Sequence, residues 1–269
     1  MRAPVLLFVI LMSAGPIVHA DGLGGSSVTY EVKPLKDDKA AYAEGQASST
    51  LSSSCKEGSF GEILLLAIER KNAGTKAITE KSERVEEKVS AQESLDGSTL
   101  KYQTRLRHDA RIDTATGTAT LGKDGGQLHT VLSRYKQDSA LPAGTLGPAA
   151  ARAALVAALM ANKPGAIEIP TVEMYRFHKP IKQIFTRLGP DDSTIARGLP
   201  KDLKPPTKEF AAGRMWALKR QVPEFNEFGD DFWLLHESGA IVRQAVTRYG
   251  VKLLFEAKEV SIFPTPTCP

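Results

Sequence analysis

Two cysteines, Cys55 and Cys268, are the residues whose chemistry the sequence constrains most. They could form a disulfide bond, remain two free thiols, or include one catalytic thiol. A nucleophile needs rigid surroundings, and Cys268 is the penultimate residue, where chain ends are poorly ordered. An even number of cysteines in an exported protein favours a disulfide. We therefore predict a structural Cys55–Cys268 bond. The entropy of closing so long a loop sets an upper estimate of roughly 5 kcal/mol on its stabilisation.

The four histidines after residue 20 have no spacing typical of a metal site. They are His108, His129, His178 and His236. An isolated histidine lacks the partners that metal binding requires, so each is predicted to be a surface residue of a strand or loop. The chain also has no glycine-rich phosphate loop, no G-x-S-x-G and no H-E-x-x-H. We predict no metal, no cofactor and no catalytic centre, so the protein is not expected to be an enzyme.

Several acidic residues could carry chemistry, and each has a simpler interpretation. Glu69, Glu93 and Asp96 could include a hydrolytic pair, but glycoside hydrolysis needs two carboxylates at a defined separation across a cleft. A cell-wall hydrolase is therefore the weakest hypothesis. Asp191-Asp192 and Asp230-Asp231 could hold a cation, although aspartates in such pairs typically serve turns and caps.

Two further groups of residues are interpreted structurally. Glu83, Glu86 and Glu87 lie among Lys81, Arg84 and Lys88, which predicts a solvated strand or ribbon. Trp216 and Trp233 lie in apolar runs and are expected in the core.

Most of the chain has the alternating pattern of half-buried strands. Val28, Tyr30 and Val32 alternate with polar residues, and so do Leu100, Tyr102 and Leu106. Val242 and Val246 face away from Arg243 and Thr247. Phe60 to Ile68 and Phe232 to Leu235 are more continuously apolar, which is typical of strands covered on both faces. Because the runs follow each other closely, their pairing is expected to be antiparallel. The chain is therefore predicted to be mainly β.

Turn signals separate these runs. Residue types that favour hairpin turns occur at Asp37-Asp38, Asn72 to Gly74, Asp96-Gly97, Lys123 to Gly126 and Glu237 to Gly239.

One helix is expected, over Pro148 to Ala161. Pro148 suits the first helical turn, and alanines give high helix propensity. Leu155 and Leu159 belong to an apolar stripe at helical spacing, and the small alanine face favours close packing in the concavity of a curved sheet. Gly189 to Pro206 is interpreted as a long loop within one domain.

The start of the chain has the features of a cleavable secretory signal. Arg2 is followed by the apolar run Val5 to Met12 and by small residues in Val18-His19-Ala20. That run is too short to span a bilayer. Residues 1–20 are predicted to be the signal, residues 21–269 one periplasmic domain with no later transmembrane segment.

The net charge of the chain bears on which classes of partner it could bind. The formal net charge of +4 falls by one when Arg2 is removed, which is too small to indicate nucleic acid or anionic lipid.

A series of motifs, in order along the chain, resembles those of a known family. They are Tyr30, Ala43-Glu44-Gly45, Cys55 within Ser-Ser-Ser-Cys-Lys-Glu-Gly, Glu93 to Gly97 with Leu100 and Tyr102, Gly117-Thr118-Ala119, Leu141 to Pro148 before the helix, and Cys268. Together they resemble the cell-envelope integrity EipB family of Gram-negative bacteria, which are secreted periplasmic proteins. The chain departs from the family pattern at Gly147, where an aromatic residue is usual, and it lacks an Asp-Gly-Ser turn in Ile167 to Pro180.

The chain resembles a divergent member of this family, and the resemblance implies both a fold and a role. The implied fold is a single domain of many antiparallel strands, in a broken, spiral-like barrel around one Ala-rich helix, similar to periplasmic lipoprotein carriers. The cysteine pair would tie an early strand to the tail. The leading hypothesis is a non-catalytic periplasmic protein that supports envelope integrity through contacts with other envelope proteins. The alternative is a carrier of a lipid or another apolar ligand, because curved sheets around a helix can enclose apolar cavities.

Overall fold

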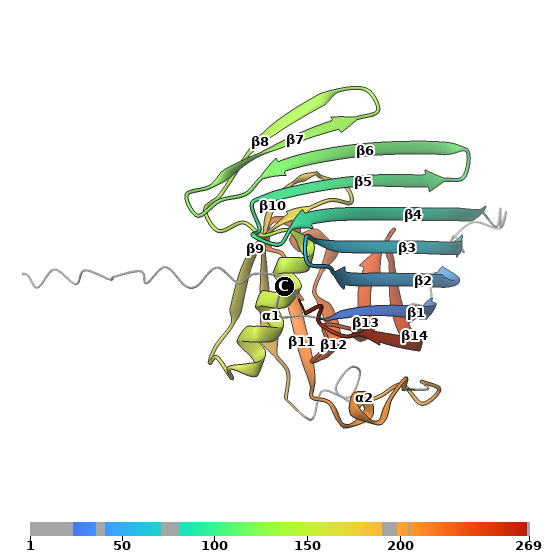
Figure 1. The fold of residues 1–269 in the computed structure, drawn as a ribbon. Coiled ribbons are helices and arrows are strands. Elements are labelled where there is room, and N and C mark those ends of the chain that lie inside the picture. Colours follow the sequence, from blue (N-terminus) through green and yellow to red (C-terminus); the bar gives the residue numbers. More distant parts are fainter. Residues whose placement is uncertain (1–23, 36–40, 71–80, 190–197, 204, 268–269) are drawn as a thin grey trace, which may run out of the picture.

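The computed structural model describes residues 24–35, 41–70, 81–189, 198–203 and 205–267. Within them, fourteen strands form one antiparallel sheet (Figure 1). The strands are β1 (Gly25–Pro34), β2 (Ala41–Ser53), β3 (Glu57–Arg70), β4 (Lys81–Ser94), β5 (Thr99–His108), β6 (Arg111–Thr120), β7 (Gly126–Leu132), β8 (Lys136–Leu141), β9 (Ile167–Glu173), β10 (Lys179–Arg187), β11 (Met215–Gln221), β12 (Asp231–His236), β13 (Ile241–Arg248) and β14 (Val251–Phe263).

The sheet consists of two meanders joined by a long-range strand pair. Strands β1 to β8 run in sequence order to one edge, and β14 back to β9 run to the other. The join is the antiparallel pairing of β1 with β14, from Gly25 opposite Phe263 to Pro34 opposite Leu253. Strand β8 also lies against β10, so the sheet curls into an open barrel. The predicted fold class, antiparallel strands in a broken barrel around a helix, is confirmed.

Hairpin turns occur where the sequence predicts them within the described residues. Gly97 and Gly239, in the turns that follow β4 and β12, have positive φ angles of 69° and 83°, which glycine adopts without strain. Lys123 to Gly126 leads from β6 into β7. The predicted turns at Asp37-Asp38 and Asn72 to Gly74 lie outside the described residues.

Strand alternation is confirmed in β1 and β5 and needs correction in β3. In β1, Val28 and Val32 are buried while Glu31 is exposed. Strand β3 was expected to be covered on both faces, but its Ile63 and Leu65 are 38% and 46% exposed. Only the concave face of this strand is covered, because the helix and the facing strands lie inside the curl.

The C-terminal strands are more deeply covered than β3. Trp233, Leu234 and Leu235 of β12 are all buried, as their continuous apolar run predicts. Strand β13 was expected to be half-buried, yet Arg243 is buried beside Val242.

A short helix helps to cover the second face of strands β12 and β13. Helix α2 (Lys208–Ala212) adds Phe210 to the apolar cluster that contains Leu234 and Val242. The only other short helical segment in the described chain is the 3-10 turn η2 (Pro223–Phe228).

Helix α1 (Pro148–Met160) lies inside the curl of the sheet (Figure 1). Its alanine face and Leu155, Val156 and Leu159 are buried, in one apolar cluster with residues of β3, β4, β5, β9, β10 and β12. Met160, at the end of the predicted stripe, is 45% exposed. No helix among the described residues is long and apolar enough to cross a membrane.

The first turn of α1 is capped by a strand rather than by a residue of its own. The buried carboxylate of Glu93 accepts hydrogen bonds from the backbone N–H groups of Ala149, at 3.1 Å, and Ala150, at 2.5 Å. A Cβ atom on Gly147 would lie 2.1 Å from Glu93 Oε2. The glycine at 147 therefore leaves the space that this cap occupies. Burial raises the pKa of Glu93 to about 7, although the two backbone hydrogen bonds act in the opposite direction.

Candidate functional site: the central cleft

A cleft with a volume of about 220 Å³ opens between α1 and the concave face of the sheet. We call it the central cleft. It is lined from β3 and β4, from α1, and from β9 to β13 with the loops between them. One part of its wall is apolar, with Phe60, Leu155 and Ile241. The remainder carries charged and aromatic side chains.

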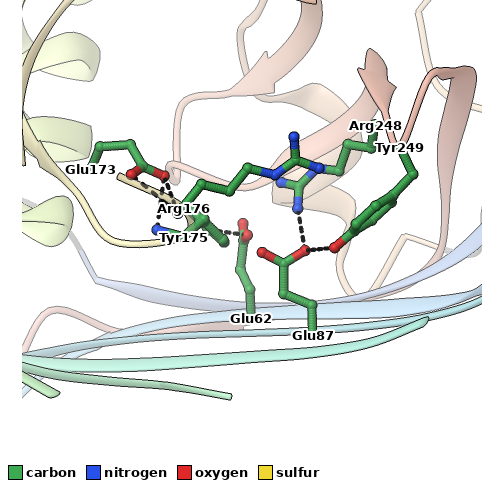
Figure 2. Close-up of polar contacts among 7 residues, drawn as sticks. All are labelled: Glu62, Glu87, Glu173, Tyr175, Arg176, Arg248 and Tyr249. Carbon is green, nitrogen blue, oxygen red and sulfur yellow. Dashed lines mark hydrogen bonds and ion pairs between the residues drawn. The ribbon is translucent and has the colours of Figure 1, made fainter. Parts of the chain in front are cut away.

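A buried carboxylate organises one side of the cleft. Glu87 of β4 accepts hydrogen bonds from Arg248 Nη1 and from the Tyr249 hydroxyl, both at 3.0 Å. Figure 2 shows Glu87 and Glu62 rising from the sheet toward Arg248, Tyr249 and Tyr175 opposite. Burial acts to lower the pKa of Arg248, but Glu87 and, to a smaller extent, the neighbouring Tyr175, Glu62 and Tyr249 together outweigh it, and the pKa is raised. Arg248 therefore stays protonated beside the Glu87 carboxylate.

A second carboxylate holds a tyrosine. Tyr175 donates its hydroxyl hydrogen to Glu62 of β3. Burial and then the nearby Glu62 carboxylate raise the pKa of Tyr175 well above its usual range, so the phenol remains a donor. The guanidinium of Arg248 lies 5.1 Å from the Tyr175 ring centroid, and that of Arg176 lies 5.0 Å from the ring of Tyr249. Two arginines and two tyrosines thus pack as one layer over the carboxylates.

The turn after β9 presents Tyr175 and Arg176 to this layer. The Glu173 carboxylate accepts backbone N–H bonds from Tyr175 at 2.8 Å and from Phe177 at 2.7 Å, with longer bonds from the two other residues of the turn. A carboxylate that binds successive backbone N–H groups fixes their conformation. His178 ends the turn with φ of +48°.

The other side of the cleft is built on Trp233. The guanidinium groups of Arg152 and Arg220 lie 5.1 Å and 5.4 Å from its ring centroid, and Phe185 packs against it at 5.2 Å. Arg220 forms an ion pair with Asp231. Arg152 of α1 donates to the backbone oxygen of Gly239 at 2.7 Å.

Two of the four predicted surface histidines are instead buried. His108 and His129 have side chains 40% and 46% exposed and pair with Glu83 and Asp138, as surface residues do. His178 and His236 are 4% and 3% exposed, so the prediction is wrong for them.

Each of the two buried imidazole rings forms a hydrogen bond within the protein. His178 Nδ1 bonds the Tyr102 hydroxyl at 3.2 Å, and His236 Nε2 bonds the Phe210 backbone oxygen at 3.1 Å. Burial lowers the pKa of both histidines, which keeps them neutral. Within the described residues, no three His, Cys, Asp or Glu side chains come together as a metal site.

The carboxylates considered for hydrolysis are not brought together. Glu93, opposite Gly58, and Glu69, opposite Ser82, lie toward opposite ends of the β3–β4 ladder. Asp96 bonds Ser98 in the hairpin turn.

The acidic pairs have separate outcomes. Asp230 and Asp231 form ion pairs with Lys219 and Arg220 of β11, rather than serving only turns or caps. Asp191-Asp192 lie outside the described residues.

The predicted solvated strand is only partly solvated. Glu83 and Glu87 are 6% and 7% exposed and face inward. Alternation could have revealed this, because they share a strand face with Val85 and Val89. The same reasoning did not single out Arg152, which lies on an otherwise apolar helix.

Only one of the two cysteines of the predicted disulfide belongs to the described residues. Cys55 is exposed in the turn between β2 and β3, and Cys268 lies outside the described residues. The sheet register places the end of β14 near that turn, since Gly25 pairs with Phe263 and Ser26 pairs with Leu51. The Cys55–Cys268 bond stays a prediction.

Comparison with known proteins identifies a similar fold. No protein-family model matches the chain, and no curated protein matches it. A crystal structure of a β-barrel-like protein from Brucella abortus, a domain of unknown function (DUF1849), superimposes with a TM-score of 0.69. The two chains are 11% identical over 90% of this chain and 99% of the other. At this identity the likeness concerns the fold alone.

Proposed function

We propose that this protein is exported to the periplasm and supports cell-envelope integrity there as a non-catalytic binding protein, a divergent relative of the EipB family. The central cleft is its binding surface for other envelope proteins. The observation that carries the proposal is the composition of this cleft, whose wall combines four arginines with Trp233 and Tyr175. Trp, Tyr and Arg are the residue types that dominate binding energy at protein interfaces.

The acids of the cleft support binding rather than catalysis. Glu87 is bound by Arg248 and Tyr249, Glu62 by Tyr175, and Asp231 by Arg220. Such pairs hold the wall in one geometry and leave these carboxylates engaged. A general acid or base needs a group that can reach the substrate proton. A preformed polar wall instead lowers the entropy lost on binding.

Carriage of a whole lipid in the central cleft has less support. A volume of about 220 Å³ is below the usual range of pockets for drug-sized ligands, roughly 300–1,000 Å³. Its wall also contains charged residues that an acyl chain would have to desolvate. A small ligand with a polar group fits this space better.

The cellular test uses a strain that lacks the gene. The full chain should restore detergent resistance, and a chain without residues 1–20 should not, because it stays in the cytoplasm. Arg176→Glu reverses the charge of an exposed residue that lines the cleft, and should reduce the rescue. Arg105→Glu makes the same change on an exposed position of β5 outside the cleft, and should rescue fully. Equal rescue by both variants at equal protein levels would refute the role of the cleft.

A further inference from the structure

Arg152 has unused donors inside the cleft. A guanidinium carries five N–H groups, and Arg152 uses Nη1 to bond the Gly239 oxygen. Among the described residues, no carboxylate lies within 4.0 Å of it, whereas Arg220 and Arg248 each have one. Three nitrogens of the described residues are both buried and without a hydrogen-bond partner, and none of them belongs to Arg152. The Arg152 nitrogens that make no hydrogen bond are therefore accessible from the cleft.

The surroundings of Arg152 favour an anion. Burial lowers the pKa of Arg152, and the nearby Tyr30 and Glu62 only partly oppose this. A guanidinium nevertheless stays protonated in proteins, so the cleft contains a poorly hydrated positive charge. Glu62 attracts it from beyond ion-pair distance while bound to Tyr175. The planar fork of an arginine matches a carboxylate with two parallel hydrogen bonds.

An apolar surface lies beside this charge. The Arg152 guanidinium stacks on Trp233, which packs against Phe185, and Leu155 of the next helical turn also lines the cleft. An aromatic body placed here would meet aromatic and aliphatic side chains while its carboxylate reached Arg152.

We propose that Arg152 and Trp233 form a binding site for a carboxylate attached to a small apolar or aromatic body. The carboxylate can belong to a free organic acid or to the C-terminus of a peptide, and the two present the same group to Arg152. The inference rests on the proposed function only in using the central cleft as the binding surface.

The test compares charged and neutral probes on the wild-type protein. The free-acid probe is 3-phenylpropanoate, and the peptide probe is acetyl-Gly-Phe with a free C-terminus. Each is paired with its carboxamide, which keeps the shape and removes the charge. Calorimetry gives Kd, and the indole fluorescence of a Trp216→Phe background reports on Trp233. We expect each bound acid to bind at least tenfold more tightly than its amide and to shift this fluorescence.

The two probe pairs also identify the source. Preference for the free acid indicates a small metabolite, and preference for the peptide indicates a chain terminus. Equal affinity of acid and amide, or no binding of either acid at millimolar concentration, would overturn the proposal.

Variants confirm which residue is responsible. Arg152→Gln should reduce the acid-to-amide ratio to about one, and Arg152→Lys should give an intermediate ratio because it keeps the charge without the fork. Arg105→Gln, on the outer surface, should leave the ratio unchanged. Should Arg152→Gln fail to fold, the wild-type acid and amide comparison still decides. Acid binding in vitro combined with normal envelope function of Arg152→Gln would keep this site and reject the proposed function of the cleft.

Discussion

Gly147→Ala tests whether the helix cap depends on one missing methyl group. Gly147 has φ of −71° and ψ of 169°, which alanine adopts freely, so the substitution introduces no backbone strain. Its Cβ would lie 2.1 Å from Glu93 Oε2 and 2.9 Å from Cδ. The carboxylate must therefore move away from the first turn of α1. Since Glu93 is only 3% exposed, it cannot exchange its two bonds for water without further rearrangement.

The cost follows from the two donors that lose their acceptor. Each buried, unsatisfied backbone N–H costs about 1–3 kcal/mol. Replacing glycine by alanine at a compatible position recovers about 0.4–1 kcal/mol through the unfolded chain. We expect Gly147→Ala to lower the free energy of unfolding by about 1–5 kcal/mol, compared with the roughly 5–15 kcal/mol typical of a domain.

Urea unfolding followed by circular dichroism measures this change. In a Glu93→Ala background the cap is already absent, so Gly147→Ala should be neutral or slightly stabilising. Gly61→Ala is the matched control, because its Cβ would meet only Val89 O, at 3.8 Å. The reasoning is refuted if Gly147→Ala leaves stability unchanged, or costs the same with and without Glu93.

Three further predictions concern buried groups and the tail. Because burial raises the pKa of Glu93 to about 7, the folded protein holds this proton while the unfolded chain, near 4.5, releases it. Stability should fall by about 3 kcal/mol between pH 4.5 and 7 and then level off. Glu93→Gln, in pH-dependent urea melts, should remove that decline, and an unchanged slope would contradict the assignment. Glu87→Leu or Arg248→Met alone should cost about 3–5 kcal/mol, and the double variant Glu87→Leu/Arg248→Met less than the sum, whereas additive losses would show that the two residues act independently. Cys55→Ser and Cys268→Ser should lower Tm equally, with no extra loss in the double variant, whereas additive losses or maleimide labelling of the unreduced protein would exclude the bond.

The sequence predicts the local elements well, because their signals are local. Alternation, Asp-Gly turns and the alanine-rich run with Pro148 determine β5, its hairpin and α1 within a few residues. The exposure of Ile63 and Leu65 was not predicted, since an apolar run does not reveal whether one or two faces are covered.

The candidate site was not predicted, because its contacts join distant parts of the chain. Glu87 and Arg248 are 161 residues apart, and in the sheet their strands, β4 and β13, are linked through the pairing of β1 with β14. No sequence pattern specifies that pairing. The inward direction of Glu87 was available from its alternation with Val85 and Val89. The identity of its partner, Arg248, could not be predicted from the sequence.

The central claim is that function resides in the central cleft, and crosslinking in intact cells tests it most directly. A photoreactive p-benzoylphenylalanine at position 176, in the cleft wall, is compared with the same residue at position 105, on the outer face of β5. The account predicts a discrete adduct with another envelope protein from position 176 only. That adduct should disappear in a Tyr175→Ala background that still folds. Adducts of equal yield from both positions, or from position 105 alone, would contradict the claim.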